Sequence, residues 1–218
     1  VLVPWERVFL LGDVALCNNM QMATNRHLHA GQQVVTRNVA KCEFVLGLAN
    51  LMTETLGSNE STQVQTMIAE IIENLEVTRS CLRAAEVDAE IDEWGVMCPA
   101  ELPLQVARNM FIRMYPRMGE ILHLLGSSSL MALPSEADMS GPLAEDISRY
   151  LETDTSSARD RVQLFRLAWD VSCSAFGARQ ILYERFFQAD SVRNAVILYN
   201  MTNREPASDI VREFLAQD

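Results

Sequence analysis

Positive charge is scarce in this 218-residue chain. Its 18 Lys and Arg residues face 29 Asp and Glu residues, so the formal net charge is −11. Nucleic-acid affinity comes mainly from cationic side chains on phosphates, and an acidic chain without a basic tract is not expected to bind nucleic acid. Long hydrophobic runs are also missing, because the longest mostly apolar stretch, residues 121–135, is too short to cross a bilayer. We therefore expect neither a nucleic-acid partner nor a membrane span.

Cysteine is infrequent and widely spaced. The five cysteines form no C-x-x-C pair, and no signal-peptide pattern opens the chain. Wide spacing without a dense framework is typical of buried free thiols in a reducing compartment. The sequence therefore predicts a cytoplasmic protein without a disulfide framework.

Common catalytic motifs are missing as well. The chain contains no G-x-S-x-G, G-x-G-x-x-G or G-x-x-x-x-G-K sequence. Glu120 and His123 form one E-x-x-H motif, whereas di-iron bundles need two. His27 and His29 are two residues apart, a spacing that does not point two helical side chains at one ion. The sequence thus predicts no metal site.

Apolar residues recur at three- and four-residue spacing through most of the chain, which is the pattern of helices buried on one face. Long helices are expected over residues 20–56, 61–94, 104–125 with a possible kink at Pro116, and 158–176 with an interruption at Gly177 and a continuation to 187. Shorter helices are expected over residues 143–151, 190–201 and 206–216. Long helices joined by short loops pack as antiparallel neighbours. The predicted fold is all-α, an antiparallel four-helix bundle with small C-terminal helices.

The first residues follow a different pattern. Residues 1–10 are rich in β-formers, and Pro4 argues against a central strand position. A single strand cannot form a sheet alone, so this stretch either pairs with another part of a longer protein or serves as a linker. We expect residues 1–15 to be a terminal strand or linker from a missing β-domain and residues 16–218 to form the helical domain.

A polar turn precedes the helix expected from Ala158. Residues 152–157 supply Thr and Ser hydroxyls that can cap a helix. The same helix end, with its free N–H groups, can also hold an anion or a polar cofactor. From the residues alone a plain cap is the simpler interpretation. Gly177 interrupts a helical pattern, where glycine is unfavourable. Close helix packing or the approach of a ligand would explain it, and so would a helix end.

Several stretches resemble one enzyme family. In chain order they are VPWERVF (3–9), RNVAKCEFVLGLA (37–49), LPSE (133–136), RVQLFRLAWD (161–170) and FGARQILYERFF (176–187), the last being the most specific. Together they resemble the oxygenase component of the 4-hydroxyphenylacetate 3-monooxygenase family, over nearly the whole chain. That family has the acyl-CoA dehydrogenase fold. The resemblance therefore implies that this chain is its C-terminal four-helix bundle.

The resemblance also implies a flavin-dependent activity. In that family a separate flavin reductase supplies reduced FAD, which reacts with O₂, and a phenol such as 4-hydroxyphenylacetate is hydroxylated ortho to its hydroxyl. The resemblance places FAD contacts at Thr153, Asp154, Thr155 and Ser156, and at Arg37 across a subunit interface. It implies no catalytic residue in this chain, because the phenol-handling residues lie largely in the family's other domains. The turn here lacks the Gly and Asn that the family often has.

Two alternatives are weighed against this interpretation. A related branch, the 4-hydroxybutyryl-CoA dehydratases, needs a cysteine seven or eight residues after a histidine, whereas Thr36 and Arg37 follow His29 at those positions. The other alternative is a stand-alone helical bundle with an assembly role and no flavin affinity. Apolar helix faces left on the bundle predict a homodimer or homotetramer.

Overall fold

The computed structural model describes residues 1–187 and 190–217. Its elements in chain order are η1 (Trp5–Arg7), α1 (Val14–Ala23), α2 (Arg26–Thr55), α3 (Thr62–Val87), β1 (Glu90–Ile91), β2 (Met97–Cys98), α4 (Glu101–Met131), α5 (Glu136–Ser140), α6 (Ala144–Leu151), α7 (Ala158–Ser172), α8 (Ala175–Phe186), α9 (Ser191–Met201) and α10 (Glu205–Leu215). The three short helices expected near 143–151, 190–201 and 206–216 match α6, α9 and α10 within about one residue.

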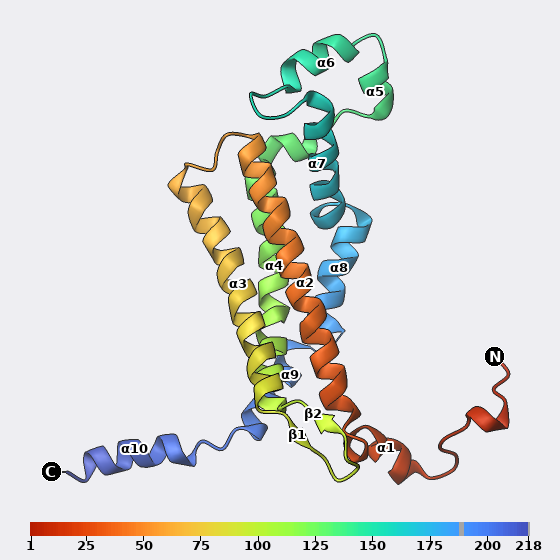
Figure 1. Ribbon diagram of the computed structural model, residues 1–218, viewed down its shortest axis with the longest axis vertical. Helices are drawn as coiled ribbons and strands as arrows, with labels where there is room; N and C mark the ends of the chain where they lie inside the picture. Colours follow the sequence, from red (N-terminus) through yellow and green to blue (C-terminus); the bar gives the residue numbers. More distant parts are fainter. Residues whose placement is uncertain (188–189, 218) are drawn as a thin grey trace.

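Helices α2, α3 and α4 and the pair α7–α8 form the bundle (Figure 1). Helices α2, α3 and α4 and the consecutive pair α7–α8 run antiparallel to their chain neighbours, and α4 packs against α2, α3, α7, α8 and α9. Helices α5 and α6 cover one end of the bundle, while α1, the β1–β2 hairpin and α10 lie at the other. The predicted all-α antiparallel four-helix bundle is confirmed.

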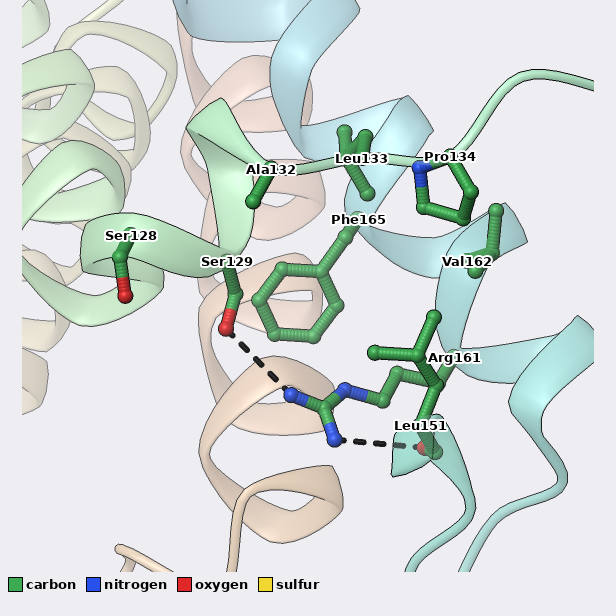
Figure 2. A pocket seen from close by; sticks show the side chains of 9 residues that line it. All are labelled: Ser128, Ser129, Ala132, Leu133, Pro134, Leu151, Arg161, Val162 and Phe165. Carbon is green, nitrogen blue, oxygen red and sulfur yellow. Dashed lines mark hydrogen bonds between the residues drawn. The ribbon is translucent and has the colours of Figure 1, made fainter. Parts of the chain in front are cut away.

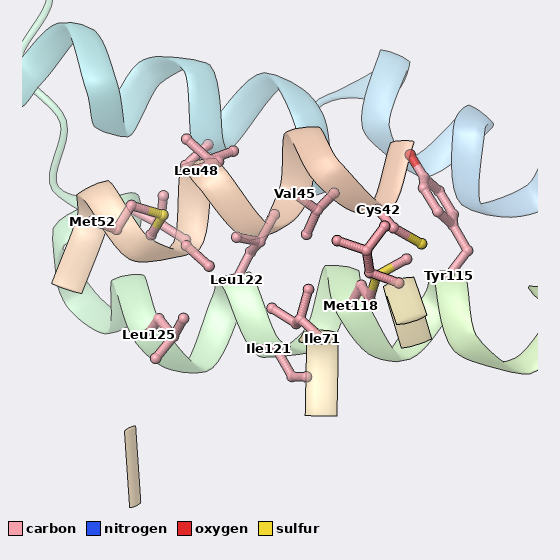
Figure 3. Close-up of a cluster of buried hydrophobic side chains, with 14 of the residues drawn as sticks. Cys42, Val45, Leu48, Met52, Ile71, Tyr115, Met118, Ile121, Leu122 and Leu125 are labelled. Carbon is pink, nitrogen blue, oxygen red and sulfur yellow. The ribbon is translucent and has the colours of Figure 1, made fainter. Parts of the chain in front are cut away.

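The hydrophobic core follows α4, the central helix (Figure 3). Its buried side chains come from α2, α3, α4 and α7 at helical spacing, as the apolar periodicity predicts. Full burial of one such side chain contributes about 1.5–3 kcal/mol. The most completely buried large members of this core are Phe111, Phe165, Met52, Ile71, Met118, Ile121 and Leu122.

The first predicted helix is in fact two helices. The apolar pattern predicts one helix over residues 20–56, whereas α1 ends at Ala23 and α2 begins at Arg26. Asn25 between them has φ 51°, a left-handed conformation that Asn adopts more readily than most residues. Its side chain donates a hydrogen bond of 3.1 Å to Asp92 Oδ2, which ties this corner to the hairpin. A long-range contact therefore fixes the break.

The second predicted helix is too long at its C-terminal end. It is expected to reach residue 94, but α3 ends at Val87. The carboxylate of Asp92 accepts hydrogen bonds from the backbone N–H groups of Val96 and Trp94, both 2.9 Å long, and Gly95 takes φ 76°. This turn joins β1 to β2, which pair antiparallel. Local turn chemistry outweighs helix propensity here.

The third predicted helix is too short. It is expected over 104–125, whereas α4 covers Glu101–Met131. Pro116 lies inside α4, and the backbone around it keeps helical angles. The break falls instead at Ser127, with φ 46° and ψ −135°. Gly126 is tightly enclosed, since a Cβ there would lie 2.5 Å from Leu130 Cγ.

The fourth predicted helix breaks earlier than expected. Helix α7 ends at Ser172, and the side chain of Ser174 caps α8 by accepting hydrogen bonds from Phe176 N and Gly177 N. Gly177 therefore lies in the first turn of α8, and its predicted role as the interruption is wrong. A Cβ at this position would lie 2.6 Å from Val171 O. The close approach of α8 to the last turn of α7 requires glycine here.

The N-terminal stretch does not form the predicted strand. Residues 1–10 contain only the 3₁₀ turn η1, and no described residue pairs with them in a sheet. Because a strand needs a neighbour to hydrogen-bond with, this stretch remains irregular. The assignment of residues 1–15 to a neighbouring β-domain stays a prediction.

The cysteines are free thiols, as their wide spacing predicts, and most of them are at least partly buried. All five cysteines are free; Cys42 and Cys98 are buried, Cys81 and Cys173 are half-buried, and Cys17 is exposed. Burial raises the pKa of Cys42 to about 12. Among the described helices, none combines the length and the apolar character that a bilayer span requires.

Candidate functional site

The polar turn between α6 and α7 is closed by its own backbone. Thr153 N donates to Ser156 O over 3.0 Å, and Ser156 N donates to Thr153 O over 3.4 Å. Ser157 then caps α7, because its Oγ accepts a hydrogen bond of 3.2 Å from Asp160 N. The hydroxyl of Thr155 donates to Glu54 O, near the C-terminal end of α2, over 3.4 Å. The predicted turn and cap are both confirmed.

Several groups of this turn face outward and are able to bind a polar ligand. Asp154 and Thr155 are exposed, and within the described chain their backbone N–H groups have no acceptor. The first turn of α7 adds the positive end of a helix of 15 residues. Asp154 and Asp160 also place two carboxylates here, which disfavours a phosphate. The groups therefore suit a hydroxyl-bearing ligand better than a phosphate.

A small pocket lies beside the turn (Figure 2). Its volume is about 130 Å³, and it is lined by α4 beyond the break, the segment after it, the end of α6 and α7. Arg161 extends along it and donates to Leu151 O over 3.2 Å and to Ser129 Oγ over 3.4 Å. In the part of the chain that the structure describes, no carboxylate pairs with Arg161. Arg161 thereby holds the end of α6, from which the turn begins, against α4.

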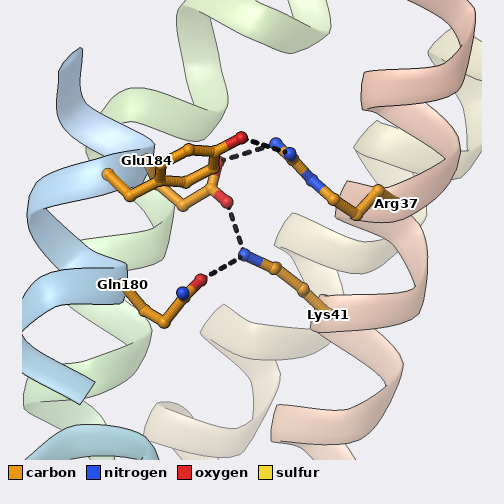
Figure 4. Close-up of polar contacts among 5 residues, drawn as sticks. Arg37, Lys41, Gln180 and Glu184 are labelled. Atoms are coloured by element: carbon orange, nitrogen blue, oxygen red, sulfur yellow. Dashed lines mark hydrogen bonds and ion pairs between the residues drawn. The ribbon is translucent and has the colours of Figure 1, made fainter. Parts of the chain in front are cut away.

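A second polar cluster joins α2 to α8 (Figure 4). Arg37 donates to Tyr183 Oη over 3.0 Å and to Glu184 Oε2 over 3.2 Å. Lys41 donates to Glu184 Oε1 over 2.5 Å and to Gln180 Oε1 over 3.0 Å. The side chain of Glu184 is 1 % exposed, whereas those of Arg37 and Lys41 are 32 % and 23 % exposed. Two cations therefore share one buried carboxylate, and the cluster carries one net positive charge.

The cluster borders an apolar cavity of about 280 Å³. Phe44, Val45 and Phe176 line it together with Tyr115 and the two cations. Burial, with the negative charge of Glu184, raises the pKa of Tyr115, so its phenol stays protonated at neutral pH. The Nε atom of Arg37 is buried and has no partner among the described residues. The two printed hydrogen bonds use two of the five guanidinium N–H groups, so terminal N–H groups of Arg37 remain unused within the described chain.

The structure does not bring all predicted site residues together. Thr153, Asp154, Thr155 and Ser156 form one turn, which contacts α2 near Glu54. Arg37 lies 17 residues earlier on the same helix, which corresponds to about 26 Å along its axis. Within one chain, the turn and Arg37 are two separate sites.

The residues considered for metal binding have other partners. Glu120 pairs with Arg117, and His123 Nε2 lies 2.9 Å from Ser172 O. His27 lies 3.6 Å from Glu101, and His29 lies 3.5 Å from Cys98 Sγ. Across residues 1–187 and 190–217, no group of three His, Cys, Asp or Glu residues is arranged to hold a metal ion.

Sequence reasoning missed Lys41, Glu184 and Arg161. A signal for the first two was present, because Arg37 and Lys41 are four residues apart, as are Gln180 and Glu184. Residues at this spacing share one face of a helix, so two cations on one helix could have been matched with two acceptors on another. Arg161 gives no such signal, because its partners are a backbone carbonyl and a serine brought close by the break in α4.

Comparison with known proteins gives the family. Residues 17–216 match the model of the C-terminal region of 4-hydroxyphenylacetate 3-hydroxylase (HpaB). The chain belongs to this family. The HpaB C-terminal region thus accounts for nearly all of the described helices, from Cys17 within α1 to the end of α10.

Individual HpaB relatives are similar over the whole chain. The oxygenase component of 4-hydroxyphenylacetate 3-monooxygenase from Thermus thermophilus is 48 % identical over 217 residues, which are 100 % of this chain and 45 % of that protein. The corresponding protein from Geobacillus sp. (strain PA-9) is 44 % identical, with 99 % and 44 % covered. This chain therefore spans about half the length of these relatives.

A solved HpaB structure shows the same fold. It is a crystal structure of the oxygenase component of 4-hydroxyphenylacetate 3-monooxygenase complexed with FAD and 4-hydroxyphenylacetate. The two chains are 48 % identical and superpose with a TM-score of 0.93 over 99 % of this chain and 45 % of that one. At this similarity the bundle described above is the HpaB C-terminal architecture.

Proposed function

We propose that this chain is the C-terminal domain of the oxygenase component of a flavin-dependent monooxygenase. The full protein uses reduced FAD and O₂ to hydroxylate a phenol such as 4-hydroxyphenylacetate ortho to its hydroxyl. The observation that carries the proposal is the 48 % identity, over the entire chain, to the Thermus thermophilus oxygenase component. A relative of the same identity was solved with FAD and 4-hydroxyphenylacetate.

The chain's part in this function is to hold FAD. Thr153, Asp154, Thr155 and Ser156 contribute hydroxyls and open N–H groups, which suit the ribityl or ribose hydroxyls of the cofactor. When bound, reduced FAD supplies the activation of O₂. The residues of this chain orient the cofactor and help to keep water from it.

Arg37 serves a second part of the cofactor. Because Arg37 lies about 26 Å from the turn along α2, it and the turn of the same chain do not hold one group of the cofactor. In a dimer, Arg37 of one copy can instead meet the FAD held mainly by the other copy. The unused terminal N–H groups of this 32 % exposed side chain and the net positive charge of the cluster suit an anionic group.

The proposed partners follow from the same assignment. They are a separate flavin reductase that delivers reduced FAD, a phenolic substrate, and further copies of this chain in a homodimer or homotetramer. The proposed location is the cytoplasm, where free thiols such as those of this chain remain reduced. No nucleic acid and no membrane takes part.

Titration of the full-length protein with FAD tests the proposal. We expect Thr153→Val with Thr155→Val, and separately Arg37→Met, to raise the Kd for FAD by about 3–10-fold per lost hydrogen bond. Ser61→Ala is the matched control, because Ser61 also precedes a helix and its side chain makes no capping hydrogen bond. The control should bind FAD like the unmodified protein.

The FAD titrations test the enzyme assignment and the named contacts separately. Absence of FAD binding by the unmodified full-length protein would favour a role in assembly only. Unchanged FAD affinity in the Thr153/Thr155 and Arg37 variants, with binding by the unmodified protein, would reject these residues as contacts. Unfolding midpoints of all variants serve to exclude loss of fold.

A further inference from the structure

Helix α10 is amphipathic and packs on no surface of the described residues. Its apolar side chains fall on one face, at Ile210 and Phe214 and at Val211 and Leu215, two pairs four residues apart. These side chains are between 56 % and 73 % exposed. Helix α10 has no buried residue and no substantial packing contact with the bundle helices.

An isolated helix of this length is marginal in water, so its apolar face needs a partner surface. Figure 1 shows α10 leaving the base of the bundle on the side opposite α8. Arg204 fixes this direction, because its guanidinium lies 3.6 Å from the centre of the Tyr199 ring and donates to Thr202 O over 3.2 Å. The partner surface is therefore not on the bundle from which α10 leaves.

The outer face of α8 has the complementary properties. Leu182 and Phe186 are 59 % and 58 % exposed and lie four residues apart, forming an apolar stripe. Arg179 and Arg185 are exposed beside this stripe. Neither arginine forms an ion pair with another residue of the described chain. We call these four residues the α8 stripe.

Charge distinguishes the candidate occupants of the α8 stripe. Helix α10 carries three acidic residues and one arginine, Arg212, which already pairs with Glu205 and Asp209 of the same helix. Glu213 has no such pair among the described residues. The acidic helix matches the arginines of the stripe, and its net charge disfavours an anionic lipid surface.

We propose that α10 of one copy docks its apolar face on the α8 stripe of a second copy, with Glu213 near Arg185. By two-fold symmetry the second α10 docks on the first α8, so each contact occurs twice. The proposal rests on the self-association included in the proposed function and names its surface. It does not depend on FAD binding, which the titration above measures separately.

Mixed disulfide formation tests the docking directly. One copy of the full chain carries Leu182→Cys and another, of different tag length, carries Phe214→Cys, both with Cys17→Ser to remove the exposed native thiol. We expect oxidation of the mixture to give a covalent product that contains both copies. Absence of this product while the chains still associate overturns the proposal. So does a purely intrachain disulfide in a chain that carries both cysteines.

Association measurements with matched charges give the second test. Phe214→Glu should raise the dissociation constant of the dimer at least about tenfold, since it places a charge in the interface centre. Ala216→Glu adds the same charge at the exposed C-cap of α10, on the polar side seven residues after Asp209, and should leave association unchanged. Because α10 buries no side chain, neither change disturbs the core. A chain that is monomeric at every concentration, or equal effects of the two variants, overturns the proposal.

A charge exchange completes the test. Arg185→Glu should weaken association, and Glu213→Arg in the same chain should restore it, because the reversed pair again has opposite charges. Light scattering after gel filtration measures both. Failure of the second change to restore association would reject the proposed pairing of Glu213 with Arg185.

Discussion

The Glu184 carboxylate lies 2.5 Å from the Lys41 ammonium, and its side chain is 1 % exposed. A buried carboxylate is costly unless cations and hydrogen bonds compensate it. Arg37 supplies the second cation, at 3.2 Å. This contact joins α2 to α8, the helix whose opposite face we propose as a docking surface.

Replacement of Glu184 by Gln leaves Lys41 and Arg37 without their shared anion. We expect the free energy of unfolding to fall by about 3 kcal/mol, the lower end for a broken buried ion pair, because both cations keep some contact with water. Glu76→Gln is the control, since Glu76 is 55 % exposed, and should cost less than about 1 kcal/mol. Urea unfolding measures both, and equal losses would contradict the role of Glu184.

Gly177→Ala is expected to destabilise the chain by about 1–3 kcal/mol. The added methyl would lie 2.6 Å from Val171 O, a backbone atom that moves only if the α7–α8 junction opens. Gly47→Ala in α2 is the matched control, because no atom apart from the local backbone of its own helix and its chain neighbours lies within 4 Å of the added methyl. Alanine there should stabilise by up to about 1 kcal/mol. Thermal unfolding should therefore shift in opposite directions for the two variants.

The five thiols should differ widely in reactivity. Burial raises the pKa of Cys42 to about 12, so at pH 8 only about one Cys42 in 10⁴ is a thiolate. Cys17 is exposed and should be alkylated first. Iodoacetamide labelling of the native chain, followed by peptide mass spectrometry, measures the order. Early modification of Cys42 would show that the core opens under native conditions.

The Glu70–Arg117 ion pair should stabilise the fold in a pH-dependent way. Its hydrogen bonds lower the pKa of Glu70 below the ordinary value of 4.5. Stability from this pair is therefore fully present above 4.5 and is lost as pH falls through the lower folded-state pKa. Because Glu70 is 38 % exposed, the effect should stay below about 1 kcal/mol.

Comparison of Glu70→Gln with the unmodified chain measures this effect. The difference in unfolding free energy should be constant from pH 6 to 7 and should shrink as the solution becomes more acidic. A difference that grows toward acid pH would give the opposite sign and would exclude the ion pair as its source.

Arg161→Gln should loosen the segment between α4 and α7. Arg161 is the side chain that ties Leu151 O, at the start of the polar turn, to Ser129. We expect faster cleavage within residues 133–157 by a low concentration of protease, since local opening becomes easier. Arg149→Gln is the control, because Arg149 lies on the exposed side of α6. Equal cleavage rates for the two variants would reject this role of Arg161.

Periodicity alone predicts the helices and the bundle, because each long helix has one apolar face and the loops between them are short. The breaks are less predictable. The corner at Asn25 depends on a hydrogen bond to Asp92, 67 residues away, and the end of α3 depends on a turn built around that same carboxylate. Such contacts exist only after the chain has folded, so spacing does not reveal them.

The candidate site also has a part that the sequence predicts and a part that it does not. The turn at residues 153–156 and its cap at Ser157 follow from hydroxyl residues before a helical pattern, and the structure has both. The Arg37–Glu184 contact joins residues 147 positions apart. The four-residue spacing of the cations and of the acceptors is visible in the sequence, but the pairing of these two helix faces is known only from the fold.

Packing in the bundle holds Ser127 in a backbone conformation that its own sequence does not favour. Its backbone angles are ones that glycine alone adopts freely, at a cost of about 1–3 kcal/mol. Position 127 is a serine, which does not favour these angles. The side chains of Leu130 and Met52 pack tightly against the neighbouring Gly126. Excised as a free peptide, residues 101–131 would lose Met52 and could relax to a helix that runs straight through Ser127. The bend belongs to the assembled bundle and not to the segment that carries it.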